Sequence, residues 1–328
     1  MTLRIGTRGS ALAVAQSTTI AEQMAAATGE QVELVRVHTE GDRSQGTGES
    51  LSTLGGTGVF ASALRESLLA GECDALVHSL KDLPTAKHPG LVIAATPARA
   101  DARDALCARD GLTLETLPQG ARVGTGSPRR MAQLRARRPD LDVLDIRGNV
   151  DTRLGRVGVD LDAVVLSAAG LGRLGRLGAA TELLGLGWWP SAPGQGSLAV
   201  EVREGERSAE IATALAAVQH DDTRLVVTAE RMVLAGLEAG CAAPIGATAV
   251  IDAGLLLLSA TVYSPAGDRR LSSSHAVSLD DDSGLPARLE DVDAVSDRVV
   301  TELLELGAAE LAPLGGGPSG GDAMASAS

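Results

Sequence analysis

The segment from Ala75 to Pro84 places polar side chains directly after an apolar run. The apolar residues 75–77 are followed without a break by His78-Ser79-Leu80-Lys81-Asp82. Near-continuous apolar strands are typical of parallel sheets, whose ligands bind at the carboxyl ends of the strands. Ser79, Lys81 and Asp82 are therefore candidates for binding and proton transfer. The alternative is a solvated turn that carries a Lys–Asp pair, since charged loops often follow strands.

Arginine recurs in turns of the same kind, each of which follows a predicted strand. These turns are Thr7-Arg8-Gly9-Ser10, Gly124-Thr125-Gly126-Ser127-Pro128-Arg129-Arg130, Arg147-Gly148-Asn149-Val150-Asp151-Thr152-Arg153-Leu154, and the segment 168–173, which ends at Arg173. Ser10 and Ser127 are suited to cap helices, and Pro128 is suited to the first helical position. Because the amino ends of helices attract anions, these turns are candidate anion sites.

The number of such arginines indicates a ligand with many acidic groups. Arginine binds carboxylate or phosphate through two parallel hydrogen bonds, and one phosphate would not need so many guanidinium groups. The arginines at strand ends are Arg8, Arg129, Arg130, Arg147, Arg153 and Arg173. An alternative for the predicted helix after Ser127 is a basic face that is solvated or touches nucleic acid. We adopt that alternative for Arg135, Arg137 and Arg138, and we expect Arg129 and Arg130 to bind ligand.

Composition limits the possible partners. The 328 residues carry a formal charge of -13, which argues against a nucleic acid or an anionic membrane as partner. Aromatic residues are almost absent, so stacking platforms for single-stranded nucleic acid are missing. The sequence contains no run as long as a membrane span and no basic, apolar leader at its start. We therefore expect a cytoplasmic protein that binds a small molecule.

The cysteines form no disulfide framework. Cys73, Cys107 and Cys241 are odd in number, lie far apart and lack the spacing of zinc ligands. Cys73 and Cys107 lie beside or within apolar strands, where we expect them to be buried as small hydrophobic residues. We predict no metal site, and any cysteine with a special role acts alone.

The order of the predicted elements is typical of an α/β fold. A strand at 3–7, a helix at 10–27 and a strand at 31–37 form a βαβ unit, and a helix at 59–70 leads into the strand before Ser79. After a further strand at 91–96, a second unit repeats the plan with strands at 105–108, 122–125, 141–146 and 163–166. Segments 97–100 and 193–196 read as crossings between the two units. Two crossings between two α/β lobes describe a hinged clamp that closes on a ligand.

The rest of the chain is predicted to return to the first lobe and then form a smaller α+β domain. The return consists of a strand at 198–202 and a helix at 208–218, and a helix at 223–237 comes next. The smaller domain contains strands at 247–251, 255–262 and 269–277 and a helix at 292–306. The predicted domains are residues 1–97 with 198–220, residues 98–197, and residues 221–313. We expect the polar, glycine-rich segment 38–58 to be a long mobile loop and the tail 314–328 to be disordered.

Taken together, these motifs resemble the porphobilinogen deaminase family, also called hydroxymethylbilane synthase. The resemblance covers nearly the whole chain in order, and its motifs are Arg8-Gly9-Ser10, residues 78–84, Ser127-Pro128-Arg129-Arg130, residues 147–154, Pro193-Gly194-Gln195-Gly196 and residues 240–246. It implies three domains, of which the first two are like the lobes of periplasmic binding proteins. It also implies a dipyrromethane cofactor, bound through a thioether to Cys241.

The resemblance also implies a reaction and the residues that perform it. Four porphobilinogens are deaminated and joined head to tail onto the cofactor, and water releases hydroxymethylbilane, whose eight carboxylates would explain the arginines. Asp82 would be the catalytic residue, because a carboxylate beside the pyrrole nitrogens stabilises the cation left by ammonia and moves protons. The residues implied to bind cofactor or substrate are Arg8, Ser10, Phe60, Ser79, Lys81, Thr125, Ser127, Arg129, Arg130, Arg147, Gly148, Asn149, Arg153, Arg173 and Gln195. We expect a monomer.

The chain departs from the family pattern at a few positions. Many relatives have lysine where this chain has Thr57 and Ser62, and Gly126 and Pro128 replace the usual serine and leucine. Two charges that contact the cofactor are therefore replaced, while the helix start after Ser127 is retained on physical grounds.

Two other functions are open from the residues alone. A two-lobed receptor for a polyanion would use the same helix starts and hinges, but it would not explain Asp82 or Cys241. A cysteine nucleophile at Cys241 would need a histidine partner, and the Gly-Cys-Ala-Ala-Pro segment has none nearby.

Overall fold

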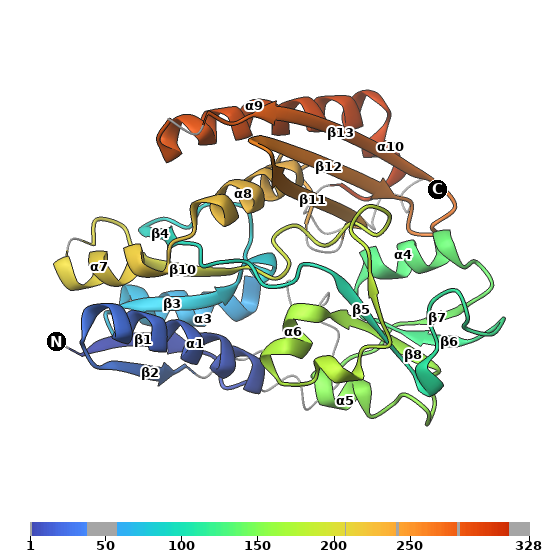
Figure 1. The fold of residues 1–328 in the computed structure, drawn as a ribbon, viewed down its shortest axis with the longest axis horizontal. Helices are drawn as coiled ribbons and strands as arrows, with labels where there is room; N and C mark the ends of the chain where they lie inside the picture. Colours follow the sequence, from blue (N-terminus) through green and yellow to red (C-terminus); the bar gives the residue numbers. More distant parts are fainter. Residues whose placement is uncertain (1, 38–57, 207, 241–242, 281–282, 315–328) are drawn as a thin grey trace, which may run out of the picture.

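The computed structural model describes residues 2–37, 58–206, 208–240, 243–280 and 283–314. Figure 1 shows two α/β lobes side by side, the first drawn mainly in blue and cyan, with β10 and α7 in yellow, and the second drawn mainly in green. A domain drawn in orange and red, at the top of the view, contains the last strands and helices. The predicted fold class, two α/β lobes joined by crossings and followed by a small α+β domain, is confirmed.

The first lobe contains a mixed sheet. Its strand order is β2 (Val32–Arg36), β1 (Leu3–Thr7), β3 (Ala75–Ser79), β10 (Leu198–Arg203) and β4 (Leu91–Ala95). Strand β1 runs parallel to β2 and β3, whereas β10 is antiparallel to both of its neighbours. The helices of this lobe are α1 (Ala11–Thr28), α3 (Gly58–Leu69) and α7 (Ala209–Val218). Aliphatic side chains from the strands, α1 and α7 form one core, as expected for a chain that has almost no aromatic residues.

The second lobe repeats this plan. Its strand order is β7 (Asp142–Leu144), β6 (Arg122–Gly124), β8 (Ala163–Ser167), β5 (Asp104–Ala108) and β9 (Glu182–Leu184). Again the first three strands are parallel to one another, and the fourth, β5, is antiparallel to both neighbours. The helices are α4 (Pro128–Arg137), α5 (Val150–Leu154) and α6 (Ala168–Arg173). Because parallel strands end at the same edge of a sheet, the polar turns that follow them lie on one side of each lobe.

The two crossings between the lobes lie side by side. The backbone nitrogen of Ala100 donates to the carbonyl oxygen of Gly196 at 3.2 Å. Gly196 has a φ of +86°, and a Cβ at this position would lie 2.5 Å from the carbonyl oxygen of Ala100. Only glycine fits both the backbone conformation and this close approach.

A buried ion pair joins both crossings to the C-terminal domain. Arg99 donates to the two carboxylate oxygens of Glu230 at 2.7 and 2.9 Å, and Glu230 is fully buried. The same carboxylate accepts the backbone N–H groups of Gly194 and Ala249. All of the ionised oxygens therefore have donors, as a buried charge requires.

The C-terminal domain packs helices on one antiparallel sheet. The strands β11 (Ile245–Asp252), β12 (Leu255–Tyr263) and β13 (Arg270–Ser278) follow one another in order. The helices are α8 (Asp221–Gly236), α9 (Leu285–Glu305) and the short α10 (Ala308–Leu311). Apolar residues of α8 and α9 share a core with the inward residues of the strands.

Most predicted elements are confirmed within a few residues, and the differences lie in long-range pairing and helix ends. Strand β9 was not predicted, and α9 begins at Leu285 rather than at residue 292, with Pro286 in its first turn. The predicted loop 38–58 lies outside the described residues except for Gly58, which begins α3, and so does the predicted tail beyond Leu314. None of the helices in the described ranges is both long and apolar enough to cross a membrane.

Candidate active site

A cavity of about 410 Å³ lies between the two lobes. Its walls come from the β1–α1 turn, the short helical turn η1 (Leu80–Asp82), α4, and the segments around α5 and α6. Among the residues predicted to act on the ligand, those that line it are Arg8, Ser10, Lys81, Asp82, Arg130, Gly148, Asn149 and Arg153. Residues that are far apart in the sequence thus converge on one space, and the arginines among them come from both lobes.

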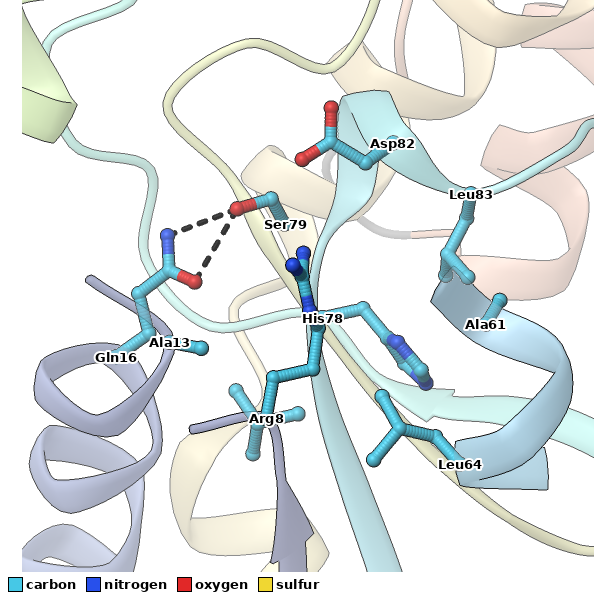
Figure 2. Close-up of a pocket in the computed structure, with 10 residues that line it drawn as sticks. Arg8, Ala13, Gln16, Ala61, Leu64, His78, Ser79, Asp82 and Leu83 are labelled. Atoms are coloured by element: carbon cyan, nitrogen blue, oxygen red, sulfur yellow. Dashed lines mark hydrogen bonds between the residues drawn. The ribbon is translucent and has the colours of Figure 1, made fainter. Parts of the chain in front are cut away.

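A smaller cavity in the first lobe adjoins this space. It shares Arg8 and Asp82 with the larger cavity and is otherwise lined partly by apolar residues of α1, α3 and β3. Figure 2 shows the Arg8 side chain directed from the end of β1 towards Ser79 and the turn that carries Asp82. Gln16 of α1 donates to the Ser79 hydroxyl at 2.8 Å, which fixes Ser79 beside this space. The Asp82 side chain stands at the boundary of the two cavities and is exposed.

A buried charge cluster lies directly below Ser79. Glu201 of β10 accepts from Arg65 at 2.8 Å and contacts His78 Nε2 at 3.2 Å. Burial raises the pKa of Glu201, but the hydrogen bonds from His78 and Arg65 outweigh it and lower the pKa to about 2. The ionised carboxylate joins α3, β3 and β10 just before the polar turn begins.

An arginine of the C-terminal domain holds the turn that carries Lys81 and Asp82. Arg231 of α8 donates to the carbonyl oxygens of Leu80 at 3.1 Å, Leu83 at 3.0 Å and Pro84 at 2.8 Å. The backbone of the turn is therefore fixed from outside its own lobe. Sequence analysis missed Arg231, since nothing in the local sequence of α8 connects it with a segment some 150 residues earlier.

Asp104, at the start of β5, is the buried carboxylate that organises the second-lobe wall. It accepts from Arg129 at 2.9 Å, Arg130 at 2.7 Å and the Trp189 indole N–H at 2.8 Å. Burial opposes ionisation of Asp104, but the two guanidinium groups prevail and hold its pKa well below the ordinary value. Sequence analysis missed Asp104 as well, because it lies in an apolar strand and its partners are distant in the sequence.

Gln195, in the second crossing, connects Asp104 with the first lobe. Its amide nitrogen donates to Asp104 at 2.7 Å, and its amide oxygen accepts from Lys81 at 3.1 Å and from Arg130 at 3.2 Å. Burial, and secondly the charge of Arg130, lower the pKa of Lys81 to about 8. The structure thus brings three predicted site residues, Gln195, Lys81 and Arg130, into one hydrogen-bonded group.

Arg153 and Arg130 present cationic groups to the cavity. Within the part of the chain that the structure describes, no carboxylate pairs with Arg153, and the Nε atoms of Arg130 and Arg153 are buried without a hydrogen-bond partner. Burial, together with the neighbouring charges of Arg130 and Arg147, lowers the pKa of Arg153. A half-buried guanidinium group beside other positive charges, such as that of Arg153, is stabilised by an anionic ligand.

Several predicted site residues do not line the cavity. Arg129 lies behind it, 3 % exposed, and donates to Asp104, Gln133 and the carbonyl oxygen of Pro190. Arg173 donates to the carbonyl oxygen of Gly196 at 2.7 Å and thus contacts the second crossing.

Three other predicted residues shape the second-lobe wall. Arg147 is exposed and pairs with Asp145 at 3.0 Å. Thr125 is fully buried, and its hydroxyl accepts from the backbone of Ser127, whose own hydroxyl caps α4. The predicted capping by Ser10 and Ser127 and the placement of Pro128 in the first turn are confirmed. Cys241 lies outside the described residues, as does the side chain of Phe60.

The prediction of a solvated basic face on α4 is wrong for Arg138. This side chain donates to Asp140 and to the carbonyl oxygens of Leu114, Glu115 and Leu117. A guanidinium group has five N–H donors, and here a nearby loop supplies acceptors that local sequence could not indicate. Arg138 therefore ties this loop to the end of α4.

Gly126 shows why one departure from the family pattern is accommodated. A Cβ at this position would lie 2.6 Å from the carbonyl oxygen of Ile146. The turn before α4 therefore packs backbone to backbone against the end of the segment that leads to Arg147. Any side chain at residue 126 would force these two turns apart.

The fold and the cavity define a class of protein: a two-lobed α/β protein with an arginine-lined cavity between its lobes. Residues 3–211 match the family model for the porphobilinogen deaminase dipyromethane cofactor binding domain, and residues 224–283 match the porphobilinogen deaminase C-terminal domain. The chain belongs to the porphobilinogen deaminase family.

Relatives of nearly full length carry the same name. Porphobilinogen deaminase of Leifsonia xyli is 64% identical over 96% of this chain and 95% of its own length. The enzyme of Cutibacterium acnes is 51% identical over 95% of this chain and 97% of its own, and that of Micrococcus luteus is 52% identical over 85% and 82%. A periplasmic substrate-binding protein from Coxiella burnetii, 13% identical, aligns with 66% of this chain and 91% of its own at a TM-score of 0.43.

Membership of this family establishes the activity. The chain is a transferase of tetrapyrrole biosynthesis, its substrate is porphobilinogen, and its first two lobes contain the domain that binds the dipyrromethane cofactor. A cofactor with several carboxylates suits the cavity, which is of the size that small-molecule sites usually have. The Nε atoms of Arg130 and Arg153, which line it, are buried and have no hydrogen-bond partner among the described residues.

The lowered pKa of Lys81 predicts an unusual reactivity. The sequence contains only two lysines, Lys81 and Lys87, and Lys87 is exposed nearby, so it serves as an internal comparison. An amine reacts with acylating reagents only when it is neutral. In cofactor-free protein we therefore expect the acetylation rate of Lys81 to rise with a midpoint near pH 8 and then level off, whereas that of a lysine with the ordinary pKa of 10.5 would still be rising at about pH 10. Brief labelling between about pH 6 and 10, followed by peptide mass spectrometry, measures the acetylation of Lys81 and Lys87 against pH. These limits span roughly two units on either side of the midpoint expected for Lys81. A Lys81 profile that is still rising steeply at the upper limit would contradict the assignment.

Proposed function

We propose that the cavity between the lobes holds the acidic side chains of the dipyrromethane cofactor and of porphobilinogen while the chain of pyrroles grows. The observation that carries this proposal is Arg153, a half-buried cation beside Arg130 for which the described residues supply no carboxylate. Arg8, from the opposite lobe, and Lys81 add positive charge to the same space. Ligand carboxylates would neutralise these groups and accept charge-assisted hydrogen bonds.

In this proposal Asp82 acts on the reacting pyrrole. Its carboxylate is exposed at the boundary between the two cavities, on a turn that Arg231 holds in place. A carboxylate in this position stabilises the positive charge that develops on the pyrrole as ammonia leaves. It can also accept and return the proton when the next pyrrole is joined.

Other predicted residues hold the cavity residues and the cavity walls in place. Arg129 and Gln195 orient Arg130 through Asp104, and Arg173 fixes the second crossing. Ser10, Ser127 and Asn149 cap the helices that begin at the cavity or beside it. Ser79, Gly148 and Phe60 complete the proposed binding set. Thr125 and Arg147 support it from outside the cavity, Thr125 through the backbone of Ser127 and Arg147 through its ion pair with Asp145.

The cofactor would be bound covalently to Cys241, and bound cofactor supplies the primer onto which pyrroles are joined. Cys241 follows α8, the same helix from which Arg231 reaches the turn of Asp82. We further propose that the enzyme acts as a monomer in the cytoplasm, in a compartment that keeps the Cys241 thiol reduced until attachment.

Replacement of Arg153 tests the binding role of the cavity. Charge-assisted hydrogen bonds contribute about 1.5 to 3 kcal/mol, so we expect Arg153→Ala to lower kcat/KM for porphobilinogen or cofactor loading by roughly tenfold or more. Arg122→Ala is the control. Arg122 lies in β6 of the same lobe, its side chain is exposed, and its ion pair with Asp142 is long, at 3.8 Å, so its removal should change little. Equal kinetics and equal loading in the two variants would refute the proposal.

The attachment of the cofactor can be read from the intact mass. The purified chain should exceed its sequence mass by one dipyrromethane, and Cys241→Ser should remove this increment while leaving the far-ultraviolet circular dichroism unchanged. Cys107→Ser, a change at a buried cysteine of β5, is the matched control that keeps the increment. A fully active protein of unmodified mass would disprove attachment at Cys241.

The role of Asp82 predicts a loss of turnover without a loss of stability. Asp82→Asn keeps the shape and removes the charge, so we expect turnover to fall by roughly 10²- to 10⁴-fold, the usual range for general acid–base catalysis. Asp82 is exposed, so the thermal denaturation midpoint should stay close to that of the parent chain. Near-normal turnover would return Asp82 to the interpretation of a solvated turn.

A further inference from the structure

A second cavity, of about 260 Å³, lies where the second lobe meets the C-terminal domain. Its walls come from α4, the segment 188–189 and the connection between β12 and β13, and α4 lies beside the end of β12 (Figure 1). None of its lining residues lines the cavity that contains Asp82. It is therefore a separate site.

The aromatic residues of the chain gather at this cavity. The sequence contains Phe60, Trp188, Trp189 and Tyr263 as its whole aromatic set, and the last three line this one space. The two indole rings meet edge to face, with centroids 5.8 Å apart and planes at 74°. Trp189 is 1 % exposed, whereas Trp188 is 37 % exposed. Trp189 also belongs to the hydrophobic core of the second lobe, and Tyr263 is buried, so Trp188 is the ring of this group that is exposed to a ligand.

Arginines surround the rings. Arg137 lies over the Trp188 ring with its guanidinium carbon 4.8 Å from the ring centroid, and Arg269 and Arg270 line the same cavity. All three are exposed, and in the described ranges none of them pairs with a carboxylate. Asp268, the acidic residue among the lining residues, accepts from Ser264, and this hydrogen bond together with the neighbouring charge of Arg269 lowers the pKa of Asp268. A local excess of unpaired arginine is notable in a chain whose formal charge is -13.

The walls of this cavity are held in place by hydrogen bonds behind them. The Trp189 indole nitrogen donates to Asp104 at 2.8 Å, and Gln133 donates to the carbonyl oxygen of Pro190 at 2.9 Å. Trp189 therefore keeps one orientation, which lowers the cost of ordering this wall around a ligand. The site is largely formed in advance, as small-molecule sites usually are.

We propose that this cavity is a second binding site that takes a single planar aromatic ring carrying two or three acidic groups. The exposed indole of Trp188 offers a surface against which the aromatic ring of the ligand can pack. The planar guanidinium groups of the arginines offer pairs of N–H donors to carboxylates at the edge of that ring. The volume of about 260 Å³ lies just below the usual range for small-molecule sites, about 300 to 1,000 Å³, which limits the occupant to a single ring. A free pyrrole diacid and an unrelated aromatic polyacid share this chemistry.

Intrinsic fluorescence reports on this site directly. The holoenzyme contains no tryptophan other than Trp188 and Trp189, and both line this cavity, so tryptophan emission reports on its walls. Because Trp189 also donates to Asp104, the substitutions below separate binding here from binding in the active cavity. The probe is benzene tricarboxylate, and two analogues test its parts: cyclohexane tricarboxylate keeps the acids without the aromatic ring, and tris(hydroxymethyl)benzene keeps the ring without the acids. We expect saturable binding of the first, several-fold weaker binding of the second and none of the third.

Substitutions then separate this site from the active cavity. Removal of one charge-assisted contact costs about tenfold or more in affinity, so Arg270→Ala and Arg269→Ala should each weaken the fluorescence titration by that factor. Both side chains are exposed, so the variants should fold, which thermal denaturation checks. Arg153→Ala, in the active cavity, and Arg122→Ala, on the surface of the second lobe, should leave the titration unchanged.

The titrations with the variants show whether this cavity is a second binding site. Saturable binding that weakens in the Arg269 and Arg270 variants alone supports it, and competition by porphobilinogen in the same titration would identify the pyrrole diacid as an occupant. Binding that none of these arginine variants alters, binding that Arg153→Ala abolishes, or equal binding of the cyclohexane analogue would overturn it. An absence of any saturable response would overturn it as well.

Discussion

The buried carboxylate of Asp104 is the group on which the rest of the site depends. It draws donors from α4, from the segment that carries Trp189 and from the second crossing, where Gln195 lies. Removing a carboxylate from water costs several kcal/mol, and only this full set of donors offsets that cost. The ion pairs with Arg129 and Arg130 therefore fix the start of α4, and through Gln195 they fix the position of Lys81.

The two lobes contribute different properties to the cavity. The second lobe supplies Arg130 and Arg153, and burial together with the charge of Arg130 lowers the pKa of Arg153. The first lobe supplies Asp82 on a turn whose backbone carbonyls are held by Arg231. The C-terminal domain thus positions the turn that carries Asp82, while its own attachment to both crossings rests on the buried pair of Arg99 and Glu230. In a chain whose overall charge is negative, positive charge is concentrated at this cavity.

Local patterns in the sequence were sufficient for most elements and for the identity of the chemistry-bearing turns. Apolar runs gave the strands, and Ser10, Ser127 and Pro128 marked helix starts that the structure reproduces. These features depend on neighbouring residues, so they can be read without knowledge of the fold. The family followed from motifs in order along the chain, and the roles of individual residues stay predictions.

Tertiary structure alone decided which of these side chains share a space. Successive residues of a helix point roughly 100° apart, so Arg129 turns into the lobe and Arg130 towards the cavity, although the sequence treats them alike. The antiparallel direction of β5 and β10, the partners of Asp104 and the reach of Arg231 across domains depend on pairings between distant segments. The gathering of Trp188, Trp189 and Tyr263 is of the same kind. Side-chain type and spacing are encoded locally, whereas the partner of a buried charge is chosen by the packing that excludes water from it.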